Sequence, residues 1–213
     1  MALSTYTLFT LTEFKEQLSI SGDGKDTPIE QIINRATATV EAYLGRQLVT
    51  RGNLTESHTP DGCFADLYLL EWPIITVTTV HESAERAYDA DSLLTVADDY
   101  IVSKPAGKIH RVFSGGGGQR VWLPGFRTVQ VVYSAGYANR SAVPDDIRSV
   151  CWDLMARKWN VDRSASHGVA SLSDATGTVT RFLPSELLSL ERQTLDMHRR
   201  VEFAGGRTGE RDA

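Results

Sequence analysis

The sequence contains little cysteine and no metal-binding spacing of cysteine or histidine. Only two of its 213 residues are cysteines, Cys63 and Cys151, and they lie far apart in the chain. The five histidines never occur at the H-x-x-x-H spacing that helical metal sites use. These absences exclude the common zinc motifs and a disulfide scaffold. Two idle thiols fit a protein that stays in a reducing cytoplasm.

Long hydrophobic runs and a strong charge of either sign are also missing. No window approaches the roughly 18 apolar residues of a membrane helix. The N-terminal segment has no charged region before its apolar residues, so we expect neither a membrane span nor a signal peptide. The formal net charge of −5 disfavours a sequence-reading DNA-binding protein, which normally carries a basic face. A mild negative charge is, however, compatible with a protein that lets DNA slide past without binding it.

The motifs of common enzymes are absent as well. The sequence has no G-x-S-x-G nucleophile motif and no G-x-x-x-x-G-K-[ST] phosphate loop. Gly115, Gly116, Gly117 and Gly118 form a run, but strand-like residues follow them where a phosphate loop needs the start of a helix. We therefore expect these glycines to form a β-hairpin tip. No catalytic residue, metal or cofactor is predicted.

Helical patterns occupy both ends of the chain. Residues 28–44 follow a threonine and carry apolar residues three and four positions apart, up to a closing Gly45. Residues 145–159 begin with two aspartates, which favour the start of a helix. A shorter helix is expected at residues 10–18, and a last one at about 184–200.

Between these helices the hydrophobic periodicity becomes that of strands. Residues 47–137 contain about seven short segments rich in β-branched residues, the sixth at 119–123, with turn signals between them. They predict an antiparallel barrel or sandwich inserted into an α-helical bundle, which is an α+β fold. The expected organisation is a helical part at 1–46, the β region, a helix at 144–160 that completes the helical part, and an arm at 161–213.

The C-terminal arm is predicted to be mobile in the free protein. Residues 160–183 are rich in serine, threonine, alanine and glycine and lose hydrophobic periodicity. Such a segment cannot bury enough apolar area to offset the entropy lost when it becomes ordered. We expect the arm to end in the helix at about 184–200.

The expected helix at 145–159 is apolar on two sides. Met155 belongs to its main apolar stripe, whereas Trp152 and Trp159, seven residues apart, lie on a second face. A neighbouring subunit would cover this second face. A wide core within one chain would cover it equally well, and the sequence leaves both alternatives open.

Four short motifs follow one another in a specific order. They are EAYLGR at 41–46, WPI at 72–74, VVYSAGY at 131–137 and PDDI at 144–147. This order resembles the head-tail connector (adaptor, or head-completion) proteins of long-tailed double-stranded-DNA bacteriophages, and the likeness covers roughly residues 7–160. The smallest members are nearly all helical, so the large β region places this chain with the longer ones.

The resemblance implies a structural protein and not an enzyme. It implies a ring, usually of twelve subunits, below the portal protein in the neck of the virion. Such a ring extends the DNA channel and offers a docking surface to the tail or to the next neck (stopper) protein. DNA would pass through without sequence-specific binding, no membrane would be involved, and the protein would be made in the cytoplasm of the bacterial host.

The resemblance also implies where contacts form, because in this family a helical part builds the ring and C-terminal segments engage the portal. Subunit contacts are therefore expected at Trp152, Met155 and Trp159. Portal contacts are expected along the arm, at Phe182, Leu187, Leu190 and Leu195. Two other functions remain open: a tail-side component such as a tail terminator, and a small ligand-binding β-domain or enzyme.

Overall fold

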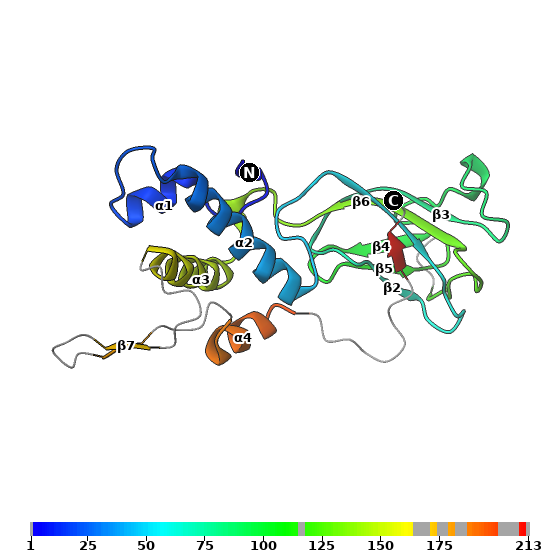
Figure 1. The fold of residues 1–213 in the computed structure, drawn as a ribbon. Helices are drawn as coiled ribbons and strands as arrows, with labels where there is room; N and C mark the ends of the chain where they lie inside the picture. Colours follow the sequence, from blue (N-terminus) through cyan, green and yellow to red (C-terminus); the bar gives the residue numbers. More distant parts are fainter. Residues whose placement is uncertain are drawn as a thin grey trace. The chain divides into compact units, whose positions relative to one another are not determined.

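The computed structural model divides the chain into two compact units (Figure 1). It describes residues 2–114, 118–163, 171–173, 179–181, 187–199 and 209–211. The helical unit comprises Met1–Gly45 and Asn139–Arg199, and the β unit comprises Arg46–Ala138 and Arg200–Ala213. The β unit is thus inserted between two parts of the helical unit, and the α+β fold class predicted from the sequence is confirmed.

The helical unit contains four α-helices among the described residues. They are α1 (Leu11–Gln17), α2 (Asp26–Leu44), α3 (Asp145–Arg163) and α4 (Ser189–Asp196). A 3-10 turn, η2 (Arg140–Ala142), precedes α3, and two short strands, β7 (Ser171–Ser173) and β8 (Val179–Arg181), pair with each other in antiparallel fashion. No helix in the described part of the chain is long and apolar enough to cross a bilayer.

The ends of the first two helices follow from local sequence. Thr10 caps α1, because its hydroxyl accepts the N–H of Glu13 at 3.1 Å while the Glu13 carboxylate accepts the N–H of Thr10 at 2.6 Å. Gly45 ends α2 with a left-handed backbone (φ 67°). The helix begins two residues earlier than predicted, since Asp26 lies in its first turn and binds Lys15 at 2.8 Å.

The β unit contains two antiparallel sheets among its described residues. The first has the order β3 (Ile74–Glu82), β6 (Val129–Ala135), β1 (Asn53–His58) and β9 (Gly209–Arg211). The second has the order β2 (Asp66–Tyr68), β5 (Lys108–Arg111) and β4 (Tyr100–Ser103). A 3-10 turn, η1 (Ala90–Ser92), lies in the connection between β3 and β4.

The two sheets share one hydrophobic core. Along the inner strand β6, every second residue is buried, as expected for a strand with one face on the core. The buried cluster takes residues from both sheets and consists of Leu67, Leu69, Ile74, Val80, Tyr100, Ile109, Trp122, Val129, Val131, Tyr133 and Ala135. The described strands therefore form two sheets around a common core, and the seven-stranded barrel, one of the two arrangements predicted, is not confirmed.

The strand expected at residues 119–123 does not form. Gln119 makes an isolated antiparallel bridge to Val112, and the segment then leaves the sheet. The indole N–H of Trp122 donates to the carbonyl oxygen of Ala65 at 2.8 Å, and the N–H of Leu123 donates to the carboxylate of Glu82 at 2.8 Å. These long-range partners replace the ladder hydrogen bonds that a strand would use.

Candidate assembly surfaces

The second apolar face of α3 packs against α1 and the residues before it. The ring of Trp152 lies 5.8 Å from that of Phe9 and 5.5 Å from that of Phe14, between centroids. Trp159 meets the ring of Phe14 edge-on at 6.0 Å. Edge-on and tilted pairs at these distances are favourable aromatic contacts. The same chain therefore covers this face, as in the second of the two alternatives left open by the sequence.

The three residues expected at subunit contacts differ in how much surface they offer. Met155 is fully buried and Trp159 is 7% exposed. Trp152 is half-buried. In this conformation Trp152 has the most surface for a neighbouring copy, and its role there stays a prediction.

Helix α4 docks on α3 through a buried ion pair. The guanidinium of Arg157 binds both carboxylate oxygens of Glu191, at 2.5 and 2.7 Å, and that carboxylate also accepts the N–H of Leu188 at 2.8 Å. A second ion pair joins His198 to Asp146. A charged pair with two parallel hydrogen bonds fixes orientation as well as distance. Residues 187–199 are therefore held on the helical unit, and the mobility predicted for residues 160–183 stays a prediction.

The residues expected at portal contacts fall into three groups. Phe182 lies outside the described residues. Leu187 and Leu195 are 9% and 0% exposed, so they hold α4 on the helical unit. Leu190 is 74% exposed, and so is Met197, seven residues further on the same side of the segment. Met197 was not among the contacts expected from the sequence.

The acidic partners of these ion pairs have pKa values below the ordinary carboxyl range. Burial by itself raises the pKa of Glu191, but the hydrogen bonds from Arg157 and from the N–H of Leu188 outweigh it. Burial likewise raises the pKa of Asp146, and the hydrogen bonds from His198 and the N–H of Ile147 outweigh it. Because both folded-state pKa values lie below their unfolded values, this stabilisation is present above about pH 4 and is lost as the pH falls further.

We therefore expect α4 to undock before the rest of the helical unit when the protein is acidified below about pH 4. The methyl signals of Leu195 in an NMR pH titration would report the transition. Glu191→Gln should remove most of the pH dependence, and Asp153→Asn, at an exposed carboxylate of α3, should leave it unchanged. Undocking that is independent of pH would contradict the assigned role of the ion pairs.

The described residues on the two sides of the glycine run pair with each other. The N–H of Phe113 donates to the carbonyl oxygen of Gly118 at 3.1 Å, and the N–H of Arg120 donates to that of Arg111 at 3.1 Å. Gly118 has a φ of 154°, whereas Gly115, Gly116 and Gly117 lie outside the described residues. No helix follows in the described residues 118–128, so the arrangement is unlike a phosphate loop.

Three of the sequence motifs meet at one place in the β unit. Arg46, 5% exposed, lies over the ring of Trp72 at 4.5 Å and over that of Tyr137 at 5.9 Å, and donates to the Trp72 carbonyl oxygen at 2.6 Å. Cation–π contacts are strengthened when both groups are withdrawn from water. The order of the motifs along the sequence gave no sign that they would meet.

Gly136 completes this cluster through a close backbone approach. Its φ is +97°, and a Cβ atom there would lie 2.8 Å from the carbonyl oxygen of Leu48 and 3.1 Å from the nitrogen of Thr50. Next to it, the N–H of Tyr137 donates to the oxygen of Leu48 at 2.7 Å, and the N–H of Thr50 donates to the oxygen of Tyr137 at 3.0 Å. The two ends of the inserted unit are thus tied together.

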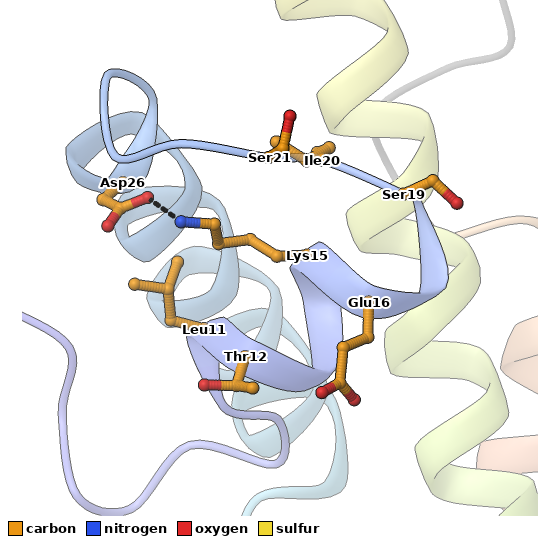
Figure 2. Close-up of a pocket in the computed structure, with 8 residues that line it drawn as sticks. All are labelled: Leu11, Thr12, Lys15, Glu16, Ser19, Ile20, Ser21 and Asp26. Atoms are coloured by element: carbon orange, nitrogen blue, oxygen red, sulfur yellow. Dashed lines mark hydrogen bonds and ion pairs between the residues drawn. The ribbon is translucent and has the colours of Figure 1, made fainter.

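An open pocket of about 470 Å³ lies between α1 and the start of α2 (Figure 2). Lys15 reaches across it to Asp26 at 2.8 Å and to Asp23 at 3.5 Å. The hydrogen bond to Asp26 raises the pKa of Lys15, so the ammonium stays charged and paired. The amine of Lys15 is therefore not available as a free base. The described His, Cys, Asp and Glu side chains also form no group of three that could hold a metal ion.

Comparison with known proteins gives a family match and a fold match. A sequence model of a family described as head completion protein matches residues 7–201. The fold is similar to chains in the neck of an empty GTA particle computed with C6 symmetry (TM-score 0.59) and of a native GTA particle computed with C12 symmetry (TM-score 0.60). A chain in the virion of a native gene transfer agent particle is also similar (TM-score 0.59).

The structural matches run nearly from end to end. Each covers 97% of this chain and 96–98% of the matched chain, at 18% sequence identity. No curated protein matches by sequence. The family model spans most of the chain and includes the residues of all four motifs. The chain therefore belongs to the head completion protein family, a family of structural proteins and not of enzymes.

Proposed function

We propose that the protein is the subunit of a ring in the neck of a phage-like virion, below the portal. There it extends the DNA channel and offers a docking surface to the tail or to the next neck protein. The observation that carries the proposal is the end-to-end likeness to chains from GTA necks computed with sixfold and twelvefold symmetry. A ring of twelve copies fits both symmetries, and a net charge of −5 suits a channel through which DNA passes without being gripped.

The test is assembly on isolated portal rings, followed by electron microscopy and sedimentation. We expect free protein to be monomeric or weakly associated, and portal rings to gain one added ring with twelvefold symmetry. Binding to tail tubes and not to portal rings would overturn the proposal in favour of a tail-side component. A thermal shift with nucleotides, sugars or divalent metals, without assembly, would instead favour a ligand-binding domain.

The outer face of α4 is the portal contact in this proposal. Leu190 and Met197 expose 74% of their surfaces, while Leu187 and Leu195 hold the helix on the helical unit. Two long apolar side chains of this docked helix thus point to solvent. A partner that covered them would remove apolar surface from water, which favours binding. Phe182 stays in the proposal as a further contact from the sequence, and Trp152 stays as a contact between subunits.

Replacing Leu190 and Met197 by glutamine is expected to weaken portal binding by tenfold or more. Each buried apolar side chain contributes about 1.5–3 kcal/mol when it is withdrawn from water, and about 1.4 kcal/mol corresponds to a factor of ten. Biolayer interferometry on immobilised portal rings would measure the change. The melting temperature should stay the same, because both side chains are exposed.

Gln193→Ala is the matched control, since Gln193 is an exposed polar residue of the same helix. It should leave portal binding unchanged. Full portal affinity in the Leu190→Gln/Met197→Gln variant would remove α4 from the proposed contact. The ring assignment would then depend on other surfaces.

A further inference from the structure

The outer edge of β1 is covered by the C-terminal strand of the chain. On one side β1 pairs with β6 along all six of its residues. On the other side only Glu56, Ser57 and His58 have partners in β9, which is the short red strand in Figure 1. β9 thus fills half of an edge that would otherwise present unpaired backbone groups.

The part of β1 that β9 covers is also the part that is buried. Glu56, Ser57 and His58 are 0%, 2% and 1% exposed, whereas Asn53 is exposed and Leu54 is half-buried. Backbone N–H and C=O groups at buried positions need hydrogen-bond partners. This half of the edge therefore requires a strand, whichever molecule supplies it.

Buried side chains add to this requirement. The carboxylate of Glu56 binds the hydroxyl of Tyr133, accepts the N–H of Leu70 at 3.0 Å, and lies 3.3 Å from Nε2 of His58. Ionisable groups placed away from water depend on their hydrogen-bond partners staying in position. A strand on the outer edge holds β1, and with it this polar cluster, in register.

Within one chain β9 is a weakly held strand. Its ladder has three residue pairs, compared with six between β1 and β6 and seven between β3 and β6. Residues 200–208 connect it to the last described residue of the helical unit, Arg199, a span of at most about 35 Å when extended. Backbone pairing is the same whether the strand comes from the same copy or from a neighbour. Only the connecting residues 200–208 therefore determine which copy supplies the strand.

We propose that the outer edge of β1 is a strand-acceptor site, and that the C-terminal strand of a second copy occupies it in the assembled ring. The inference rests on the proposed ring. Strand addition to a sheet edge gives affinity through main-chain hydrogen bonds. Exchange keeps every contact of the single chain and adds a link between copies. Neighbours held side by side in a ring reach the effective concentrations at which such a weak ladder exchanges.

Two single-cysteine variants test this exchange directly. One copy carries Ser57→Cys and the other carries Glu210→Cys, both with Cys63→Ser, because Cys63 is an exposed thiol. Ser57 and Glu210 are direct partners across the two strands, the placement that a cross-strand disulfide needs. Neither copy can form this bond within itself, so a disulfide-linked dimer of the two copies reports exchange.

The mixed copies are oxidised mildly after assembly on portal rings and, separately, at high concentration without portal. With equal amounts of the two variants, a Ser57→Cys copy has a Glu210→Cys copy as its strand donor in about half of the cases, so we expect up to about half of the copies to become linked dimers in assembled rings. A Ser57→Cys/Glu210→Cys chain that becomes linked only within itself would overturn the exchange. Strand exchange would also be overturned if the mixed copies formed no disulfide-linked dimer either on portal rings or at high concentration without portal. Asp98→Cys, at an exposed position, replaces Glu210→Cys as the control and should give few dimers.

The result is separable from the proposed function. Rings that assemble on the portal without linked dimers leave the neck role intact and remove strand exchange. Failure of rings to form removes the neck role. The concentrated sample without portal then decides on exchange by itself.

Discussion

Replacing Arg111 by methionine is expected to lower the free energy of unfolding of the β unit by about 3–5 kcal/mol. The guanidinium is 2% exposed and binds the carboxylate of Glu82 at 3.0 Å and that of Asp99 at 3.1 Å. It also donates to the Asp99 carbonyl oxygen at 2.6 Å and lies 5.8 Å from the ring centre of Trp122. Without it, the Glu82 carboxylate, 8% exposed, loses its cationic partner in a buried place.

Denaturant unfolding of protein labelled with fluorotryptophan would measure this change in each unit separately. Trp72 and Trp122 lie in the β unit, whereas Trp152 and Trp159 lie in the helical unit. The Arg111→Met variant should shift the unfolding midpoint of the first pair of fluorine signals. The second pair should shift much less, since its contacts are in the other unit.

A neighbouring ion pair provides the matched control. Lys108 lies on the same strand, β5, and binds Asp66 at 2.8 Å with 28% of its side chain exposed. Lys108→Met should cost about 1 kcal/mol or less, because exposed ion pairs contribute little. Arg111→Met/Glu82→Gln should recover part of the loss. If Lys108→Met destabilises the β unit as much as Arg111→Met, burial of the Arg111 network is not what makes it important.

Gly136→Ala is expected to be the second severe change, with a loss of about 2–4 kcal/mol. A side chain at φ +97° is strained, which by itself costs about 1–2 kcal/mol. The added Cβ would also lie 2.8 Å from the backbone oxygen of Leu48, and a paired backbone cannot move away as a flexible side chain can. The fluorine signal of Trp72, which lies in the same motif cluster, should report the loss.

Gly52→Ala separates the two causes. Gly52 has a similar φ of +102°, but no atom lies within 4 Å of the position that its Cβ would take. It should therefore show the cost of strain alone, about 1–2 kcal/mol. Equal losses in the two variants would mean that the close approach to Leu48 contributes nothing.

Elements with strong local signals were predicted well from the sequence. α2 and α3 carry apolar residues at helical spacing and acidic residues in their first turns, so both were found near their observed bounds. β6 combines β-branched residues with a buried residue at every second position, and it is one of the two inner strands of its sheet. These signals lie within a few consecutive residues, which is the range over which a sequence can be interpreted by itself.

Features that depend on distant partners were not predictable in this way. Nothing near Trp122 indicates that its indole N–H binds Ala65, so residues 119–123 were expected to be a strand. The docking of α4 depends on Arg157 and Glu191, which are 34 positions apart. The exposure of Met197 follows only once α4 is docked. Because these contacts set the candidate surfaces, the fold was more predictable than the sites.

The paired ends of the inserted unit affect how the chain folds during synthesis. One hundred residues, from Gly45 to Pro144, separate α2 from α3. At a synthesis rate of about 5–20 residues per second, α3 is therefore made about 5–20 s after α2. The six strands β1–β6 emerge during this interval. Once Tyr137 pairs with Leu48, the loop between the two helices shortens roughly tenfold, which saves about 2 kcal/mol of closure entropy. The β unit thus prepares the helical unit to close as soon as α3 leaves the ribosome.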